Sequence, residues 1–110
     1  MNPHDAAHQL AKSIKESEEY HNFIKAYNEL KNDSTASNIF NDFRQLQMEV
    51  QEEQAKGNEI SSEKEEQLQK LSQSATYNQI VKNFIEAEYR FANIIKDVQQ
   101  IIADAIDIGE

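Results

Sequence analysis

The last third of the sequence carries an apolar pattern that strongly limits how this part of the chain can fold. Its apolar residues are separated by alternating intervals of three and four positions: Tyr77, Ile80, Phe84, Ala87, Phe91, Ile94, Val98, Ile101, Ala105 and Ile108. This spacing places the side chains along one face of an α-helix, as a sustained heptad seam. The pattern predicts one long helix from about Thr76 to Asp107.

A second, less complete apolar stripe lies beside this seam. It consists of Val81, Ile85, Ala92, Ile95, Ile102 and Ile106. Together the two stripes form a wider apolar surface than one neighbouring helix would cover. We therefore expect the last helix to contact at least two neighbours.

The rest of the chain also has helical apolar spacing and almost no residues that favour sheet turns. Only two glycines and one proline occur in 110 residues. Helix starts are predicted at Asn2 with Pro3, at Ser17, at Asp33 or Ser34, and at Ser62 with Glu65, and a helix end is predicted near Gly57. We expect an all-α fold: an elongated antiparallel helical bundle or hairpin with a long C-terminal helix. Residues 1–110 should form a single helical domain.

Helix lengths predict a segment without cover. At 1.5 Å per residue the last helix would be roughly 48 Å long, but the helix that ends near Gly57 only roughly 35 Å. The segment from Ile94 to Ile108 would then overhang, with more exposed apolar surface than soluble monomers normally tolerate. Either the weakly apolar first helix folds back over it, or a second copy of the chain packs there, or both occur together. We expect a homodimer whose interface includes Phe84, Phe91, Ile94, Val98 and Ile101.

Charge and cysteine content exclude several kinds of partner and chemistry. Twenty acidic and eleven basic residues give a formal net charge of -9, which repels phosphate backbones and anionic lipid. We therefore expect no direct nucleic-acid binding. The absence of cysteine excludes disulfides, thiolate nucleophiles and cysteine-ligated metal on this chain. No signal-peptide pattern or membrane-length apolar segment is found, so we expect a cytoplasmic protein without membrane insertion.

The histidines are the main candidates for a metal site. His4 and His8 are one helical turn apart, a spacing that lets two imidazoles reach one ion, and His21 is the third histidine. Glu18 and His21 form one Glu-x-x-His motif, whereas di-iron helical bundles use two. A metal-binding helical protein that uses His4, His8 and His21 is therefore the alternative to an interaction protein. We expect no bound metal or other cofactor.

The remaining acidic residues do not form a recognisable catalytic pattern. Glu86 and Glu88 are two positions apart on the last helix and do not face each other, so Glu88 is interpreted as a charge beside the seam with Lys82 or Arg90 as its partner. Seven glutamates lie between Glu49 and Glu66, as a solvated face or a docking surface. No phosphate-binding loop or nucleophile elbow occurs. We expect a protein without catalytic residues that is not an enzyme.

Several segments resemble one family. They are Asp5, Ala7 and Leu10; Glu16 to Tyr20; Phe40 to Arg44, as Phe-x-x-Phe-Arg; Gln51 to Ile60, with Gly57; and Glu86 to Glu88, followed by the apolar stripe from Ile94 to Ile102. They run through most of the chain. Together they resemble the YlbF/YmcA family of small bacterial helical proteins, in particular its YheA-like branch.

The resemblance implies a function through protein partners. It implies an oligomerising, all-helical, cytoplasmic regulatory protein, because characterised relatives are adaptors in a complex that acts on development and on messenger RNA processing through ribonuclease Y. Family paralogues and a ribonuclease complex are thus the implied partners. Relatives that hold an iron–sulfur cluster use cysteines in a C-terminal tail, and this chain has none. Cluster binding is therefore not carried over to this chain.

Overall fold

The computed structural model describes residues 1–107, and these form five α-helices without any β-strand. The helices are α1 (Pro3–Lys15), α2 (Glu18–Asn32), α3 (Ser34–Ala55), α4 (Ser62–Tyr77) and α5 (Gln79–Ala105). The predicted all-α fold with a long C-terminal helix is confirmed. Ile108, the last residue of the predicted seam, lies outside the described residues.

Side chains at the helix ends explain most of the boundaries. The side chains of Asn2, Ser17 and Asp33 accept hydrogen bonds from the first-turn backbone N–H groups of α1, α2 and α3. Each bond satisfies a donor that has no partner within the helix. Gly57 follows α3 with φ of +80°, a conformation that side chains with a Cβ atom rarely adopt. These four predicted boundaries are confirmed.

Two predicted boundaries were wrong. The cap of α4 is Ser61 and not Ser62, since the Ser61 hydroxyl accepts from the backbone N–H of Lys64 at 3.2 Å. The last helix does not begin at Thr76, because extended backbone at Asn78 (φ -85°, ψ 114°) separates α4 from α5. The Asn78 side chain accepts from the N–H groups of Ile80 and Val81, both at 3.1 Å. Tyr77 therefore ends α4 and does not extend the seam of α5.

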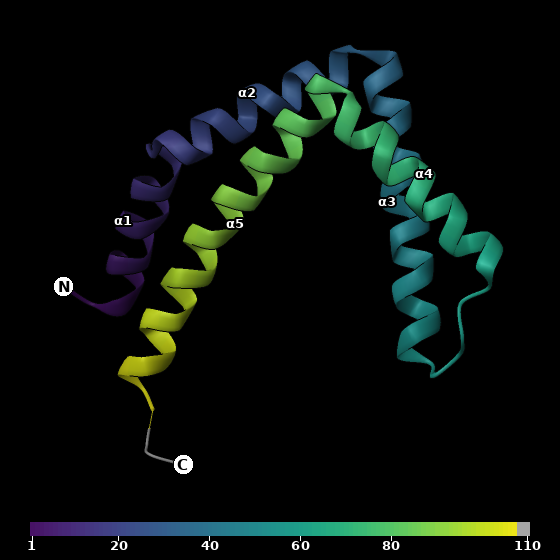
Figure 1. The fold of residues 1–110 in the computed structure, drawn as a ribbon. Helices are drawn as coiled ribbons and strands as arrows, with labels where there is room; N and C mark the ends of the chain where they lie inside the picture. Colours follow the sequence, from purple (N-terminus) through teal and green to yellow (C-terminus); the bar gives the residue numbers. More distant parts are fainter. Residues whose placement is uncertain (108–110) are drawn as a thin grey trace.

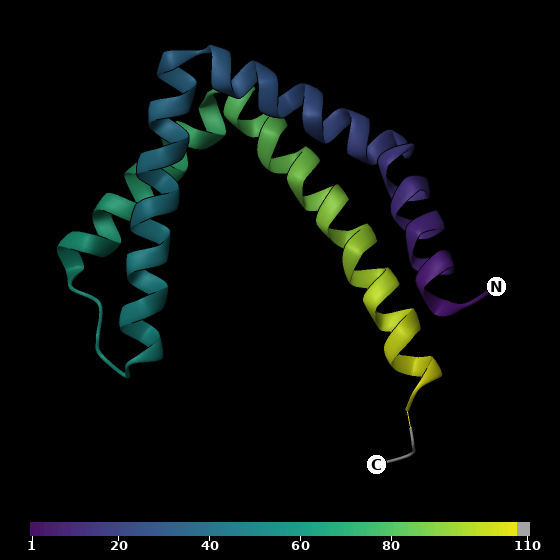
Figure 2. The ribbon, with the colours of Figure 1, turned by 180° about the vertical axis from the view of Figure 1, so that it is seen from behind.

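The five helices form an arch with two arms that meet at an apex (Figure 1). One arm contains α1, α2 and α5, and the other is the hairpin of α3 and α4, as the reverse view also shows (Figure 2). The radius of gyration is 18.2 Å, compared with about 13 Å for a compact chain of this size. The elongated shape that the helix lengths predicted is thus confirmed.

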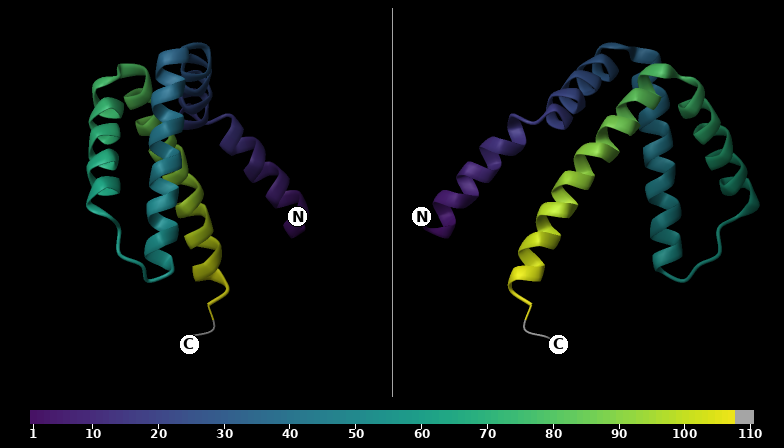
Figure 3. Two further views of the ribbon diagram at one scale, coloured as in Figure 1. Left: turned by 90° about the vertical axis from the view of Figure 1, so that its right-hand side faces the viewer. Right: turned by 60° about the vertical axis from the view of Figure 1, so that its left-hand side comes forward.

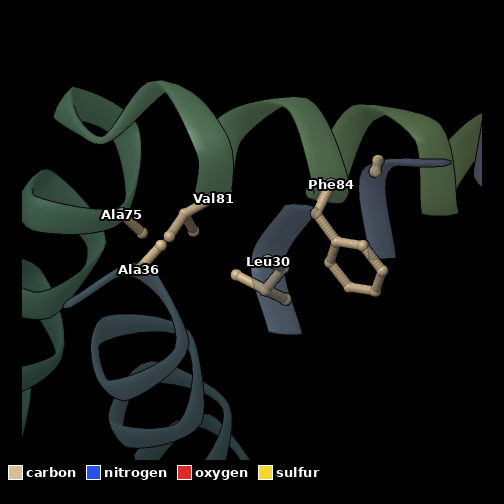
Figure 4. Packing of buried hydrophobic residues seen from close by; sticks show 6 residues of the cluster. Leu30, Ala36, Ala75, Val81 and Phe84 are labelled. Atoms are coloured by element: carbon tan, nitrogen blue, oxygen red, sulfur yellow. The ribbon is translucent and has the colours of Figure 1, made fainter. Parts of the chain in front are cut away.

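The main core lies at the apex, where four helix ends meet. Small residues allow this close approach: Ala36 of α3 is fully buried and Ala75 of α4 is 2% exposed. Val81 and Phe84 from the start of α5 and Leu30 from α2 pack in the same cluster (Figure 4). The helix α5 contacts α2, α3 and α4, so the prediction of at least two neighbours is confirmed.

Away from the apex, α1 and the end of α5 separate. The helix α1 contacts α2 but not α5, and none of its residues is buried. Both helices point toward the same end of the molecule, as two further views show (Figure 3). In this structure the first helix therefore does not fold back over the end of α5.

Candidate interaction surface

An aromatic series joins α2 to the first half of α5. Phe23 stacks on Phe91 with the ring centroids 5.3 Å apart, and Tyr20 meets the same ring edge-on at 5.4 Å. Phe84 contacts Phe23 at 5.6 Å and Phe40 of α3 at 5.0 Å. Such pairs contribute about 0.5–1.5 kcal/mol each beyond the area they bury. These contacts fix α5 against α2 as far as Phe91.

The second half of α5 has no such cover. We call residues 94–106 the distal α5; they include the last three turns of the helix and its C-cap residue, Ile106. The exposed fractions of Ile101, Ile102 and Ile106 are 68%, 52% and 73%. Three isoleucines within 13 residues are thus exposed to solvent. Such a cluster differs from the single, scattered apolar residues that are normal on a monomer surface.

The five predicted interface residues differ in position. Phe84 is 4% exposed and lies in the apex core, so its surface is already used within the chain. Phe91, Ile94 and Val98 are partly buried, and Ile101 is exposed. The structure therefore places four of the five where a partner could reach them. The interface itself stays a prediction.

The helix α1 presents a second apolar surface without cover. Ala7, Leu10, Ala11 and Ile14 recur at the spacing of one helix face. Of these, Ile14 is partly buried and the other three are exposed, Leu10 at 36%. We call α1 and the distal α5 together the fork. Its two helices lie at one end of the molecule without contact between them (Figures 1 and 3).

An ion pair between the arms was missed by the sequence analysis. Arg44 of α3 donates from Nη2 to Oε1 of Glu88 on α5 at 2.6 Å, and its guanidinium lies 4.9 Å from the centroid of the Phe40 ring. Glu88 was expected to pair with Lys82 or Arg90 on its own helix, so that interpretation was wrong. The sequence places Arg44 directly after Phe43, which packs against the core, but this position does not identify Glu88 as the partner.

The remaining candidates lie on exposed surfaces. His4 and His8 on α1 and His21 on α2 are all exposed. Within residues 1–107, no three histidine, cysteine, aspartate or glutamate side chains gather closely enough to hold a metal ion. The acidic stretch from Glu49 to Glu66 spans the end of α3, the connecting loop and the start of α4, at the tip of the hairpin arm.

Comparison with known sequences agrees with the fold and the segments described above. The sequence model of a family described as "Control of competence regulator ComK, YlbF/YmcA" matches residues 4–107. The chain belongs to the YlbF/YmcA family. A UPF0342 protein from Desulfitobacterium hafniense is 38% identical over 96% of this chain and 86% of its own length. A UPF0342 protein from Clostridium tetani is 37% identical over 98% and 93%. The YheA-like branch stays a prediction.

Two solved structures are similar to this YlbF/YmcA chain. A protein of unknown function (DUF964) from Bacillus stearothermophilus superposes with a TM-score of 0.82 at 30% identity, over 94% of this chain and 90% of that one. Bacillus subtilis RicA, solved in complex with RicF, superposes with a TM-score of 0.67 at 25% identity, over 94% and 91%. The arch is therefore shared with relatives, one of which is seen bound to another protein.

Among the helices of the described residues, none combines the length and the apolar character needed to cross a bilayer.

Proposed function

We propose that the chain is a non-enzymatic, adaptor-type interaction protein that binds a second copy of itself through the distal α5. The observation that carries this proposal is the apolar stripe of α5, which continues beyond the helices that cover it, to Ile101 and Ile102. Burial of apolar surface is favourable by about 25 cal/mol per Å². A partner that covers these side chains is therefore bound by the same effect that holds the apex together.

The comparisons support partners that are proteins. RicA, which shares the arch, was solved in complex with RicF, and the family description concerns control of a regulator. For this chain we extend the proposal to other family members and to a ribonuclease complex, both in the cytoplasm. A charge of -9 favours protein partners over direct contact with nucleic acid. In this proposal the chain regulates its partners by binding them and not by catalysing a reaction.

A single charged substitution tests self-association. Ile101→Glu places a carboxylate within the exposed stripe, where burial in an interface would leave it unpaired. We expect the wild-type chain to have twice its monomer mass by light scattering, and I101E to have the monomer mass with unchanged helicity. Gln100→Glu, on the opposite side of the same helix, adds the same charge and should leave the dimer intact. A monomeric wild-type chain, or an I101E dimer, would contradict the proposal.

A further inference from the structure

Both helices of the fork have apolar faces that nothing in the described chain covers. On α1 this face includes Leu10 and Ala11, and on the distal α5 it includes Ile101 and Ile102. The two helices come from opposite ends of the sequence, but the fold brings them to the same end of the molecule (Figure 3). A partner that approaches this end therefore meets two unpartnered apolar faces and not one.

The lengths of the two surfaces match. The helix α1 has 13 residues, and the helical part of the distal α5, residues 94–105, has 12. At 1.5 Å per residue each is roughly 20 Å long. The distal α5 of another copy therefore has the length to lie along either surface from end to end.

The charges of the fork favour a second copy of the same chain. The helix α1 carries Lys12 and Lys15 against Asp5, a balance of +1, within a chain of net charge -9. The distal α5 carries one lysine, Lys96, and two aspartates, Asp97 and Asp104, a balance of -1. Contact of one copy's α1 with the other's distal α5 therefore joins opposite balances, which steers association and opposes wrong pairings. Contact between two distal α5 segments, each with a balance of only -1, is favoured by burial of their apolar side chains and not by charge.

The hairpin arm, in contrast to the fork, offers no complementary charge balance to a second copy. Between residues 34 and 77 there are eight acidic and four basic residues, a balance of -4. Two copies that met through this arm would bring like charges together. Among the surfaces of the described chain, the fork is thus the one that combines uncovered apolar faces with complementary charge.

We infer that the fork receives the distal α5 of a second copy, which packs against α1 and the distal α5 of the first copy at once. This inference rests on the proposed self-association and gives α1 a specific task in it. Under two-fold symmetry the contact is reciprocal, so each α1 covers the distal α5 of its partner. The dimer contact is then a bundle of four helix segments, two from each copy.

The area of contact supports the participation of α1. A helix stretch of about 20 Å length and 10 Å width covers roughly 200 Å². A contact between the two distal α5 segments alone would bury about that area on each copy, whereas a stable interface buries about 800 Å² per partner. Adding the two reciprocal contacts with α1 brings the buried area to roughly 600 Å² per copy, much closer to that requirement.

Site-specific cross-linking tests this arrangement cleanly because the chain has no cysteine of its own. A tagged Leu10→Cys chain and an untagged Ile102→Cys chain are mixed, allowed to exchange subunits and treated with a short bis-maleimide. We expect a covalent product that contains one tagged and one untagged chain. Tyr77→Cys, 87% exposed at the apex, replaces I102C in the control and should give little of this product.

The possible outcomes separate this inference from the proposed function. A dimer in which I102C chains link to each other but not to L10C chains would overturn the inference and leave self-association standing. A double L10C/I102C chain that links only within itself, as a monomer, would show that α1 covers its own α5. That result, or a monomeric wild-type chain, would overturn both this inference and the proposed self-association.

A charge scan of α1 gives an independent measure. Leu10→Asp should weaken the dimer about tenfold or more, as expected for loss of one buried leucine. Gln9→Asp adds the same charge on the opposite side of α1 and should leave the dissociation constant within about twofold of wild type. Because α1 contains no buried residue, neither substitution should reduce the helicity of the chain. Equal affinities for wild type and L10D would overturn the inference.

Discussion

The two halves of α5 share one apolar pattern but differ in what covers it. In the first half, Val81 is 0% and Phe84 is 4% exposed, because α2, α3 and α4 all converge there. In the second half, Ile101 and Ile102 are 68% and 52% exposed. Both halves have the spacing of a buried helix face, so the difference arises from the neighbours and not from α5 itself.

The reason for the difference is the length of the neighbouring helix. The helix α5 has 27 residues, whereas α2, which runs along it, has 15. Beyond Ser17 the chain turns, and α1 leaves the direction of α2 without contacting α5 (Figure 1). The cover of α5 therefore ends where α2 begins. Apolar periodicity determines which face of a helix is to be buried, and the lengths of its neighbours determine how much of that face they reach.

Removal of the buried ring in the first half should have the largest effect on folding. Phe84→Ala should lower the free energy of unfolding by about 3–5 kcal/mol, since it leaves a cavity between α2, α3 and α5. Ile101→Ala, in the second half, should change it by less than about 0.5 kcal/mol at protein concentrations low enough for the chain to be monomeric. Urea unfolding followed by circular dichroism measures both.

A milder substitution at Phe84 provides a second test of the difference between the two halves of α5. If F84A does not fold, Phe84→Leu keeps an apolar side chain at the apex and should still be less stable than wild type. Equal losses for the Phe84 and Ile101 variants in the monomer would mean that the distal α5 is covered within its own chain.

The stability of the chain should depend on protein concentration only through the second half of α5. If the distal α5 is buried between copies, each tenfold dilution of wild type should lower its apparent stability by up to about 1.4 kcal/mol. The I101E chain should show no such dependence, and the Gln100→Glu control should behave as wild type. Thermal melts over a hundredfold concentration range would show this. A wild-type melting temperature that is independent of concentration would argue against a dimer.

Most of the helix boundaries could be predicted because their signals are local. Asn2 with Pro3, Ser17 and Asp33 were identified as starts from residue type alone, and Gly57 was identified as an end. The break at Asn78 was missed because Tyr77 fits the seam of α5. Tyr77 has the spacing of the seam but is 87% exposed, so its match to the pattern is coincidental and spacing by itself does not reveal the break.

The candidate site was predictable only in part. The uncovered stripe, with Ile94, Val98 and Ile101, was predicted by comparing the last helix with the helix that ends near Gly57, but the helix that actually runs along α5 is α2. The position of α1 was not predictable, since it depends on the direction of the chain after Ser17. The ion pair of Arg44 with Glu88 joins residues 44 positions apart, and no local rule selects such a partner.

Removal of the cap at the break should have a moderate effect on the first half of α5. Asn78→Ala removes the acceptor for the N–H groups of Ile80 and Val81 and should lower stability by about 1 kcal/mol. Asn78→Ser keeps a capping oxygen and should restore most of the loss. Because the cap lies at the apex, both variants should retain the dimer affinity of wild type. An Asn78→Ala variant as stable as wild type would mean that packing alone determines where α5 begins.

The ion pair between the arms should have the smallest effect. Both partners are more than one-third exposed, at 38% and 37%, so solvent screens their attraction. A double-mutant cycle with Arg44→Met and Glu88→Gln should give a coupling of about 0.5–1 kcal/mol at low salt, decreasing in about 1 M sodium chloride.

The pair of Lys56 with Glu52 on α3 provides the control for this cycle. Its side chains are 59% and 68% exposed and lie on one helix, so its coupling should be no more than about 0.5 kcal/mol. A coupling energy for Arg44 with Glu88 that exceeds the one for Lys56 with Glu52 would show that contact between α3 and α5 outweighs solvent screening. Equal values would mean that the apex core alone holds the two arms at their angle, because the ion pair then adds no more than a surface contact.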